Sequence, residues 1–226
     1  MSIKEQITSI RGELPDGVEL VAVSKTHPAE AVVAAYNAGM RVFGENKAQE
    51  MRAKHEVLPE DIEWHMIGHM QTNKVKYIAP FVAMIQSVDS VRLLDVIDKE
   101  AAKNGRVIDV LMEVYIAQEE SKSGWETEEL LEYLRSGAHL AKPNIRIRGL
   151  MGMASFTDDE QQVRAEFTVL RELHDRVRGE FFADDPAFDT LSMGMTSDWR
   201  IAVECGSTMV RIGSAIFGAR DYGTEE

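Results

Sequence analysis

The feature of the sequence that most restricts its fold is an alternation of short apolar runs with longer stretches of helical period. Eight runs rich in Val, Ile and Met occur, at 20–24, 41–46, 63–68, 82–87, 107–114, 146–152, 190–194 and 209–213. Runs of this length are typical of buried strands, and strands that alternate with helices pair in parallel. Eight such units in 226 residues predict the α/β class and a (β/α)₈ TIM barrel, because an open doubly wound sheet usually has fewer strands.

Helix-end signals mark the stretches between these runs. Pro28 stands at the expected first helical position of one segment, with Gly39 just past its end, and Asp89 and Ser90 are the N-cap candidates of another. A third helix is expected over residues 158–178, where apolar residues recur every three or four positions. The segment before Leu20 predicts an extra N-terminal helix that covers one end of the barrel.

Composition excludes several classes of protein. No linker or low-complexity run divides residues 1–226, so a single domain is expected. The formal charge is 25 − 38 = −13, which argues against nucleic acid as a partner. No signal peptide or membrane span is expected, because no stretch approaches about 18 apolar residues. One cysteine, Cys205, allows no intramolecular disulfide and favours the reducing cytoplasm.

A barrel fold predicts where functional residues lie. Barrel enzymes build their sites from the loops at the carboxyl ends of the strands. Polar residues of suitable type stand at those ends: Lys25, Glu45, Asn46, His65, Ser87, Thr196, Ser197, Arg211, Gly213 and Ser214. We therefore expect these residues to gather at one rim of the barrel.

Lys25 and Arg211 are the candidates with the most definite chemistry. A lysine amine that is partly desolvated at an apolar rim becomes a nucleophile that forms Schiff bases with aldehydes. The alternative is a solvated lysine or an ion pair of Lys25 with Glu45. Arg211 lies inside the last apolar run and requires an acceptor, because an unpaired buried charge is costly. Either a ligand supplies that acceptor or a structural ion pair with Glu113 or Glu204 does.

The loops after the last two strands combine the features of a phosphate site. The backbone N–H groups of Gly213 and Ser214 precede an apolar stretch that is expected to begin a short helix, and Thr196 adds a hydroxyl. The alternative is ordinary capping and turn chemistry at the same residues. His65 is expected either to contact a ligand or to be a hydrogen-bonded core residue, which is the commoner role of a lone histidine on a buried strand.

Several blocks of the sequence together resemble one protein family. These blocks are VAVSKTHP (21–28), FGENKAQE (43–50), WHMIGHMQTNK (64–74), SVDS (87–90), RGLMGMA (148–154) and LSMGMTSDWRIAVECGSTMVRIGSAIFGARDY (191–222). They are similar to the YggS/PROSC group of pyridoxal phosphate homeostasis proteins. The resemblance extends over nearly the whole chain.

The resemblance implies the barrel of the N-terminal part of alanine racemase, a fold type III barrel without the C-terminal β domain, which binds pyridoxal 5′-phosphate (PLP). It implies that Lys25 forms the Schiff base and that Arg211 faces the pyridine nitrogen. The phosphate contacts fall on Thr196, Gly213 and Ser214, with Thr replacing the commoner Ser at position 196. The remaining residues that the motif blocks bring to the pocket are Asn46, His65 and Ser87.

The function implied by the resemblance is PLP homeostasis, in which the protein holds PLP and delivers it to PLP-dependent apo-enzymes. Arginine stays protonated and leaves the pyridine nitrogen without a proton, which weakens the ring as an electron sink, so no robust catalysis is expected. Because the sequence ends at Glu226, soon after the last strand, we expect a monomer without a second catalytic domain. The alternatives are a small PLP-dependent amino-acid racemase with Lys25 as base and a barrel enzyme that acts on a sugar phosphate.

Overall fold

The strands form a closed parallel barrel in sequence order, as predicted. The computed structural model describes residues 1–117 and 123–218. The strands of the barrel are β1 (Glu19–Val23), β2 (Val42–Glu45), β3 (Glu63–Met66), β4 (Met84–Val88), β5 (Ile108–Glu113), β6 (Ile145–Met151), β7 (Thr190–Met195) and β8 (Met209–Ile212). Each of these strands overlaps one of the apolar runs, so the TIM-barrel prediction is confirmed.

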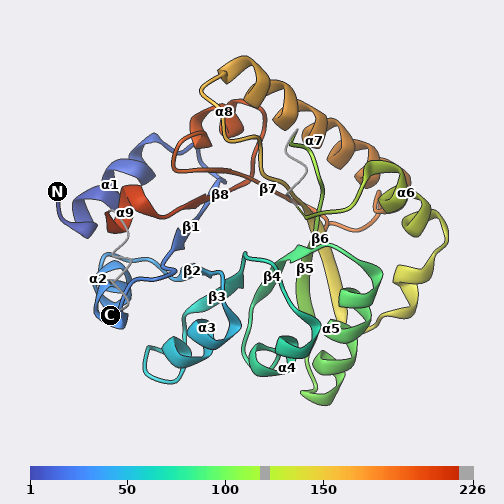
Figure 1. Cartoon of the computed structure of the whole chain (residues 1–226), viewed down its shortest axis with the longest axis horizontal. Coiled ribbons are helices and arrows are strands. Elements are labelled where there is room, and N and C mark those ends of the chain that lie inside the picture. The colour runs from blue at the N-terminus through green and yellow to red at the C-terminus, as the bar shows by residue number, and fades with distance from the viewer. Residues whose placement is uncertain (118–122, 219–226) are drawn as a thin grey trace, which may run out of the picture.

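Helices surround the barrel as an outer ring (Figure 1). They are α1 (Ile3–Glu13), α2 (Ala29–Asn37), α3 (Ala48–His55), α4 (Val75–Ile78), α5 (Val91–Lys103), α6 (Thr127–Arg135), α7 (Glu160–Phe181), α8 (Trp199–Glu204) and α9 (Ser214–Phe217), with short 3₁₀ turns η1 (Thr72–Lys74) and η2 (Ala138–Ala141). Of the two cap candidates, Ser90 caps α5 by accepting from the N–H of Leu93, whereas Pro28 is the N-cap residue of α2 and not its first helical residue. In the described part of the chain, no helix has both the length and the apolar character needed to span a bilayer.

The N-terminal helix is present, but its position differs from the expected one. Ser2 and Glu5 form a capping box that starts α1. Ile7 and Ile10 are buried in the core that lies outside the strands, and α1 packs against α2 and α9. The helix therefore stands in the outer ring beside β1 (Figure 1) and does not cover a barrel end, because its apolar side matches the outward face of the strands.

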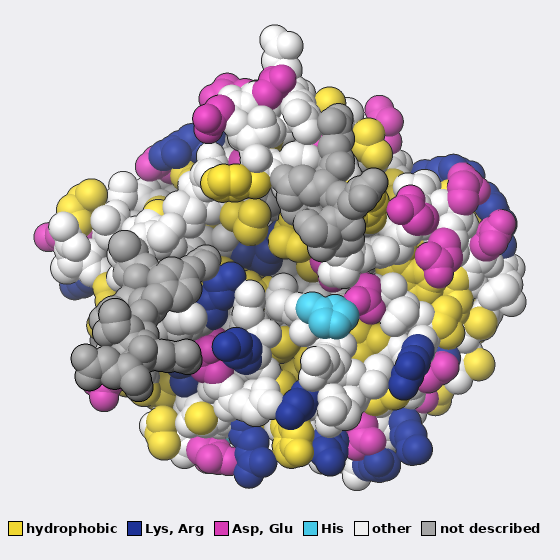
Figure 2. All heavy atoms as spheres, in the orientation of Figure 1, with side chains coloured by type: hydrophobic (Ala, Val, Ile, Leu, Met, Phe, Trp, Pro, Cys, Tyr) yellow, Lys and Arg dark blue, Asp and Glu magenta, His cyan; other side chains and the backbone are white. Residues whose placement is uncertain are grey.

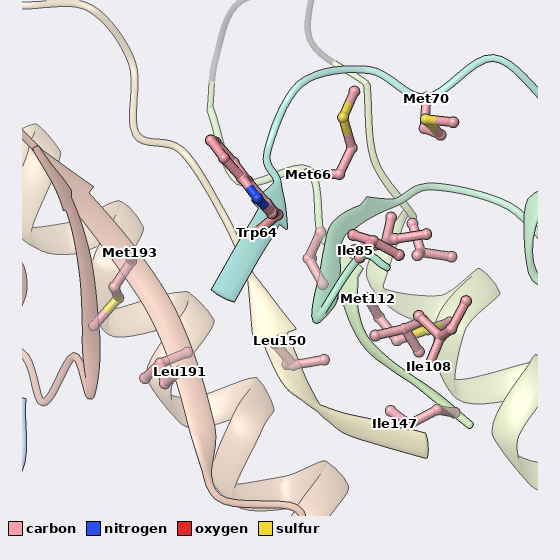
Figure 3. Close-up of a cluster of buried hydrophobic side chains, with 14 of the residues drawn as sticks. Trp64, Met66, Met70, Ile85, Ile108, Met112, Ile147, Leu150, Leu191 and Met193 are labelled. Atoms are coloured by element: carbon pink, nitrogen blue, oxygen red, sulfur yellow. The ribbon is translucent and has the colours of Figure 1, made fainter. Parts of the chain in front are cut away.

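Alternation along the strands separates two apolar cores. Side chains that face outward pack against the helices, and Figure 3 shows part of this core around Trp64, Ile85 and Leu150. A smaller core fills the barrel interior, consisting of Val21, Val42, Met84, Leu111, Met151 and Met209. Because successive residues of a strand point to opposite faces, the residues two positions beyond these interior ones also point inward.

Two details of the sheet shape the rim where the site is expected. Closure pairs β1 with β8 in parallel, with Val21 opposite Arg211. A bulge interrupts β6 between Ile147 and Gly149, which pair with consecutive residues of β5. Gly149 has φ +153°, and a Cβ at this position would lie 1.7 Å from the carbonyl oxygen of Thr190, so only glycine allows β6 and β7 to approach this closely.

Candidate functional site

Lys25 lies two residues beyond β1, in the turn that leads to α2, and is partly buried. Thr26, the next residue, has φ +66°, which is the one positive φ of a non-glycine residue in the described chain. This conformation is unusual for a β-branched side chain and requires support from its surroundings. The turn is therefore a strained segment at the rim that was predicted to carry function.

Glu45, one alternative partner for Lys25, is engaged elsewhere. It is fully buried under α3, and its Oε1 lies 2.6 Å from the Nζ of Lys54. The same Oε1 accepts a hydrogen bond from the hydroxyl of Ser24 at 2.6 Å. Burial raises the pKa of Glu45 to about 7, although the ammonium of Lys54 acts in the opposite direction.

A chain of hydrogen bonds crosses the barrel interior below the rim. Arg211 donates from Nη1 to the hydroxyl of Ser192 at 2.5 Å and from Nη2 to the carbonyl oxygen of Gly152 at 3.0 Å. The Ser192 hydroxyl donates to Gln86 Oε1 at 2.7 Å, and Gln86 Nε2 lies 2.9 Å from His65 Nδ1. Because an amide nitrogen can only donate, His65 Nδ1 accepts and the imidazole proton is on Nε2. This chain orients the guanidinium inside the barrel.

The protonation states along this chain follow from burial. Complete burial lowers the pKa of His65 to about 3, so its ring is neutral near pH 7. The structure therefore gives His65 a hydrogen-bonded interior position. Burial also lowers the pKa of Arg211, to about 10, and the carboxylates of Asp198 and Glu113 oppose this effect. Arg211 thus stays protonated near neutral pH.

Of the two structural ion pairs considered as alternatives to a ligand for Arg211, the one with Glu204 is not formed. Glu204 lies on the outer side of α8 and pairs with Arg164 at 2.5 Å. Glu113 points into the barrel two residues beyond Leu111 and lies within electrostatic range of Arg211, without an ion pair between them in the described structure. Arg211 instead uses a neutral hydroxyl and a backbone carbonyl, which leaves further guanidinium N–H groups for a ligand.

Glu113 is a buried acid that the sequence pattern suggested only as a partner of Arg211. Glu113 is 2% exposed, the hydroxyl of Ser123 lies 3.3 Å from its Oε1, and its Oε2 has no hydrogen-bond partner among residues 1–117 and 123–218. Burial, and secondarily the charge of Asp89, raises the pKa of Glu113 to about 7. An acid of this kind, inside a barrel mouth, is typical of functional sites.

The structure brings together the two loops that were expected to form a phosphate site. The hydroxyl oxygen of Thr196 accepts a hydrogen bond from the backbone N–H of Gly213 at 3.3 Å. Ser214 is exposed at the first position of α9. A Cβ at Gly213 would lie 3.1 Å from the carbonyl oxygen of Val23, so the loop after β8 touches the end of β1. The Lys25 turn and the β8 loop are therefore adjacent.

The remaining two candidates shape the loop that follows β3. The hydroxyl of Ser87 donates to the carbonyl oxygen of Gly68 at 2.6 Å. A Cβ at Gly68 would lie 2.7 Å from the backbone oxygen of Asn46, which shows how closely this loop packs on the end of β2. Asn46 also lines a cavity of about 210 Å³, together with His69 and Lys74. His69 in turn pairs with Asp89 at 3.2 Å.

A larger cavity, of about 530 Å³, lies beside the expected phosphate loops. It is lined by the segments at and after the ends of β6 and β7, including Met153, Phe156 and Met195, and by none of the eight residues expected to bind the cofactor.

On the face shown in Figure 2, basic and acidic side chains are interspersed around the edge of the molecule, with a histidine near the middle. Over residues 1–117 and 123–218, no group of three His, Cys, Asp or Glu side chains is arranged to hold a metal ion.

Two polar residues of the interior chain, Gln86 and Ser192, were missed by the sequence analysis. Each stands at an inward position of an otherwise apolar strand, β4 and β7 respectively. A polar residue at such a position requires a partner inside the barrel. This alternation was the available signal, and counting inward positions from Met84 would have identified Gln86.

Comparison with known proteins agrees with this geometry. The family model described as alanine racemase, N-terminal domain, matches residues 1–221. A protein of Aquifex aeolicus named pyridoxal phosphate homeostasis protein is 44% identical over 213 residues, which is 94% of this chain and 90% of the relative. The protein of the same name in Escherichia coli is 39% identical over 215 residues, which is 93% of this chain and 89% of the relative. The chain belongs to the pyridoxal phosphate homeostasis protein family.

Solved structures support membership of this family. PipY of Synechococcus elongatus, solved with PLP bound, has a TM-score of 0.87 and 35% identity over 96% of this chain and 100% of the PipY chain. An alanine racemase of Clostridium difficile has a TM-score of 0.77 at 13% identity, over 99% of this chain and 57% of the racemase chain. The second likeness shows a shared barrel fold.

The raised pKa of Glu113 predicts a pH dependence of stability for this family member. The folded state binds the Glu113 proton up to about pH 7, whereas the unfolded chain releases it near its ordinary pKa of about 4.3. The free energy of unfolding should therefore fall as the pH rises through this window, by up to about 3 kcal/mol for one carboxyl. Urea unfolding at pH 5 and pH 8 measures the difference.

Replacing Glu113 with Gln removes the carboxyl group that titrates. The variant should lose less stability than the wild type between pH 5 and pH 8, while Glu60→Gln, at an exposed position of the same residue type, should keep the wild-type slope. An unchanged slope in Glu113→Gln would show that Glu113 titrates in the folded protein as it does in water.

Proposed function

We propose that this chain binds PLP at the carboxyl end of its barrel and holds it, through the amine of Lys25, for delivery to PLP-dependent apo-enzymes. The observation that carries the proposal is the meeting of two distant segments at one rim. Val21 pairs with Arg211 across the closure of the barrel, and the position of a Cβ on Gly213 lies 3.1 Å from the end of β1. An amine, a guanidinium and phosphate donors are thereby within one small region.

The donor set suits the chemistry of PLP. A phosphate dianion accepts hydrogen bonds from hydroxyl and backbone N–H groups, and the Thr196 and Ser214 hydroxyls and the N–H of Gly213 are donors of this kind. In the described structure the N–H of Gly213 donates to the Thr196 hydroxyl at 3.3 Å, and bound phosphate would share or replace this acceptor. The proposed binding residues are Lys25, Asn46, His65, Ser87, Thr196, Arg211, Gly213 and Ser214.

Several features favour a protein that holds PLP over an enzyme that uses PLP to turn over a substrate. PLP, when bound, supplies an aldehyde that reacts with amines and a ring that withdraws electrons from the attached carbon. Arg211, which is protonated near neutral pH, would donate to the ring nitrogen and not protonate it. His65 is neutral and buried, so it supports the Arg211 chain and does not deliver protons. The proposal extends to a cytoplasmic monomer whose partners are PLP and acceptor proteins.

The phosphate assignment is tested by Ser214→Asp. A carboxylate at this exposed position would face the phosphate and repel it, so the dissociation constant for PLP should rise at least about tenfold, or about 1.4 kcal/mol. Ser214→Ala, which removes the hydroxyl without adding charge, should weaken binding less. Visible absorption titrations at constant ionic strength measure both constants. Unchanged affinity in Ser214→Asp would put the phosphate elsewhere.

A further inference from the structure

A buried cluster of charged residues lies behind the Lys25 turn, on the outer side of the barrel wall. We call Glu45, Glu50 and Lys54 the Lys54 clamp. The ammonium of Lys54, whose side chain is 8% exposed, lies 2.6 Å from Glu45 Oε1 and 2.8 Å from Glu50 Oε1. Lys54 and Glu45 are buried and Glu50 is 23% exposed; burying such a pair of ionisable groups is expensive, and apolar residues would pack the same space at lower cost. The clamp therefore requires an explanation beyond stability.

The clamp binds the backbone on both sides of Lys25. Lys54 Nζ donates to the carbonyl oxygen of Ser24 at 2.7 Å, and the N–H of Thr26 donates to Glu50 Oε1 at 2.6 Å. The hydroxyl of Ser24 also donates to Glu45 Oε1. The residues that precede and follow Lys25 are therefore both attached to charged groups, which form stronger hydrogen bonds than neutral ones.

The conformation of Thr26 indicates what these bonds achieve. A φ of +66° costs a β-branched residue about 1–2 kcal/mol relative to an ordinary turn. The N–H of Thr26 lies in the peptide plane that joins Lys25 to Thr26, so its bond to Glu50 fixes the orientation of that plane directly before the strained φ. The direction in which the Lys25 side chain leaves the turn depends on this conformation.

We propose that Glu50 and Lys54 are positioning residues that hold the turn around Lys25 and so set the orientation and reactivity of its amine. This inference rests on the proposed role of Lys25 as the attachment point for PLP. The clamp acts through the backbone of Ser24 and Thr26 and does not itself need to contact the ligand.

The experiment compares Glu50→Ala with Glu50→Gln. Glu50 is partly exposed on α3, Ala favours helices, and Lys54 keeps its bonds to Glu45 and Ser24, so Glu50→Ala is expected to fold. Glu50→Gln retains an amide oxygen that can accept from Thr26. The matched control is Glu100→Ala, which removes an acid from an exposed lysine pair on α5, Glu100 with Lys103.

Two quantities are measured on each folded variant. The first is the dissociation constant for PLP. The second, on protein freed of PLP, is the pH profile of acetylation of Lys25 by acetic anhydride, read by mass spectrometry relative to the exposed Lys4. Glu50→Ala should weaken PLP binding at least about tenfold and displace the acetylation midpoint of Lys25. Glu50→Gln should stay within about threefold of the wild type, and Glu100→Ala should change neither quantity.

The outcomes separate the two proposals. A Glu50→Ala protein that only loses stability, with unchanged affinity and acetylation profile, would overturn the positioning role. Lys54→Met removes the hydrogen bond to the Ser24 carbonyl and tests the same positioning role with the same two measurements. If the wild type captures PLP at another lysine, the proposed function fails, while the acetylation profile of Lys25 still decides whether the clamp controls its amine.

Discussion

Replacing Lys25 with alanine is expected to abolish the borohydride-stable attachment of PLP to this protein. Lys25 is in the turn at the end of β1, beside the loop of Gly213, whereas Lys47 and Lys74 lie around the loop after β3. After reduction of the wild type with borohydride, mass spectrometry of peptides should find the pyridoxyl group on Lys25. The Lys25→Ala protein should lose this mass and the visible absorption band together.

The control for this experiment is Lys47→Ala, which removes an exposed lysine near the end of β2. It should leave the adduct and the spectrum as they are in the wild type. An adduct found mainly on Lys47 or Lys74, or a visible band that survives in Lys25→Ala, would contradict the assignment of Lys25.

We expect Gly149→Ala to cause a large loss of stability, because alanine at this position has the shortest Cβ contact of any glycine in the described chain. The new Cβ would lie 1.7 Å from the carbonyl oxygen of Thr190, at a φ of +153°, so β6 and β7 would have to separate. A backbone clash of this kind should lower the free energy of unfolding by at least about 4 kcal/mol. Urea unfolding followed by circular dichroism measures the loss.

Gly179→Ala is the matched control. Gly179 is exposed within α7, and a Cβ there meets nothing within 4 Å, so alanine should stabilise the protein by about 0.5–1 kcal/mol. A Gly149→Ala protein as stable as the wild type would show that the β6 bulge can be rebuilt. The bulge also matters to the site, because Gly152, three residues further on, accepts a hydrogen bond from Arg211.

Local sequence patterns were sufficient to predict the strands and helices and to place candidate residues at the carboxyl rim of the barrel. Strands such as β1 and β5 are short runs of apolar residues, and the Ser90 cap begins α5 as predicted. Each of these signals depends on neighbours within a few positions, which sequence displays directly. The positions of Lys25 and Thr196 at strand ends followed from the same patterns, because a parallel barrel collects all carboxyl ends at one rim.

Partners between distant residues were decided by the tertiary structure. The hydrogen bond from Ser192 to Gln86 joins positions 106 residues apart, and no local spacing encodes the barrel closure that brings Val21 opposite Arg211. The position of Arg211 in an apolar strand predicted that it needs an acceptor and left a ligand or a glutamate open, whereas in the described structure it donates to a neutral hydroxyl and a carbonyl.

The sequence by itself determined an eight-stranded α/β barrel with an amine, an arginine and hydroxyl groups at its carboxyl rim, because apolar period, caps and strand ends are local properties. The tertiary structure alone decided that α1 joins the outer ring, that Gln86 and Ser192 support Arg211, and that Lys54 holds the turn around Lys25. The physical reason is that hydrogen bonds and ion pairs form between atoms within about 3 Å, and closure of the sheet sets those distances.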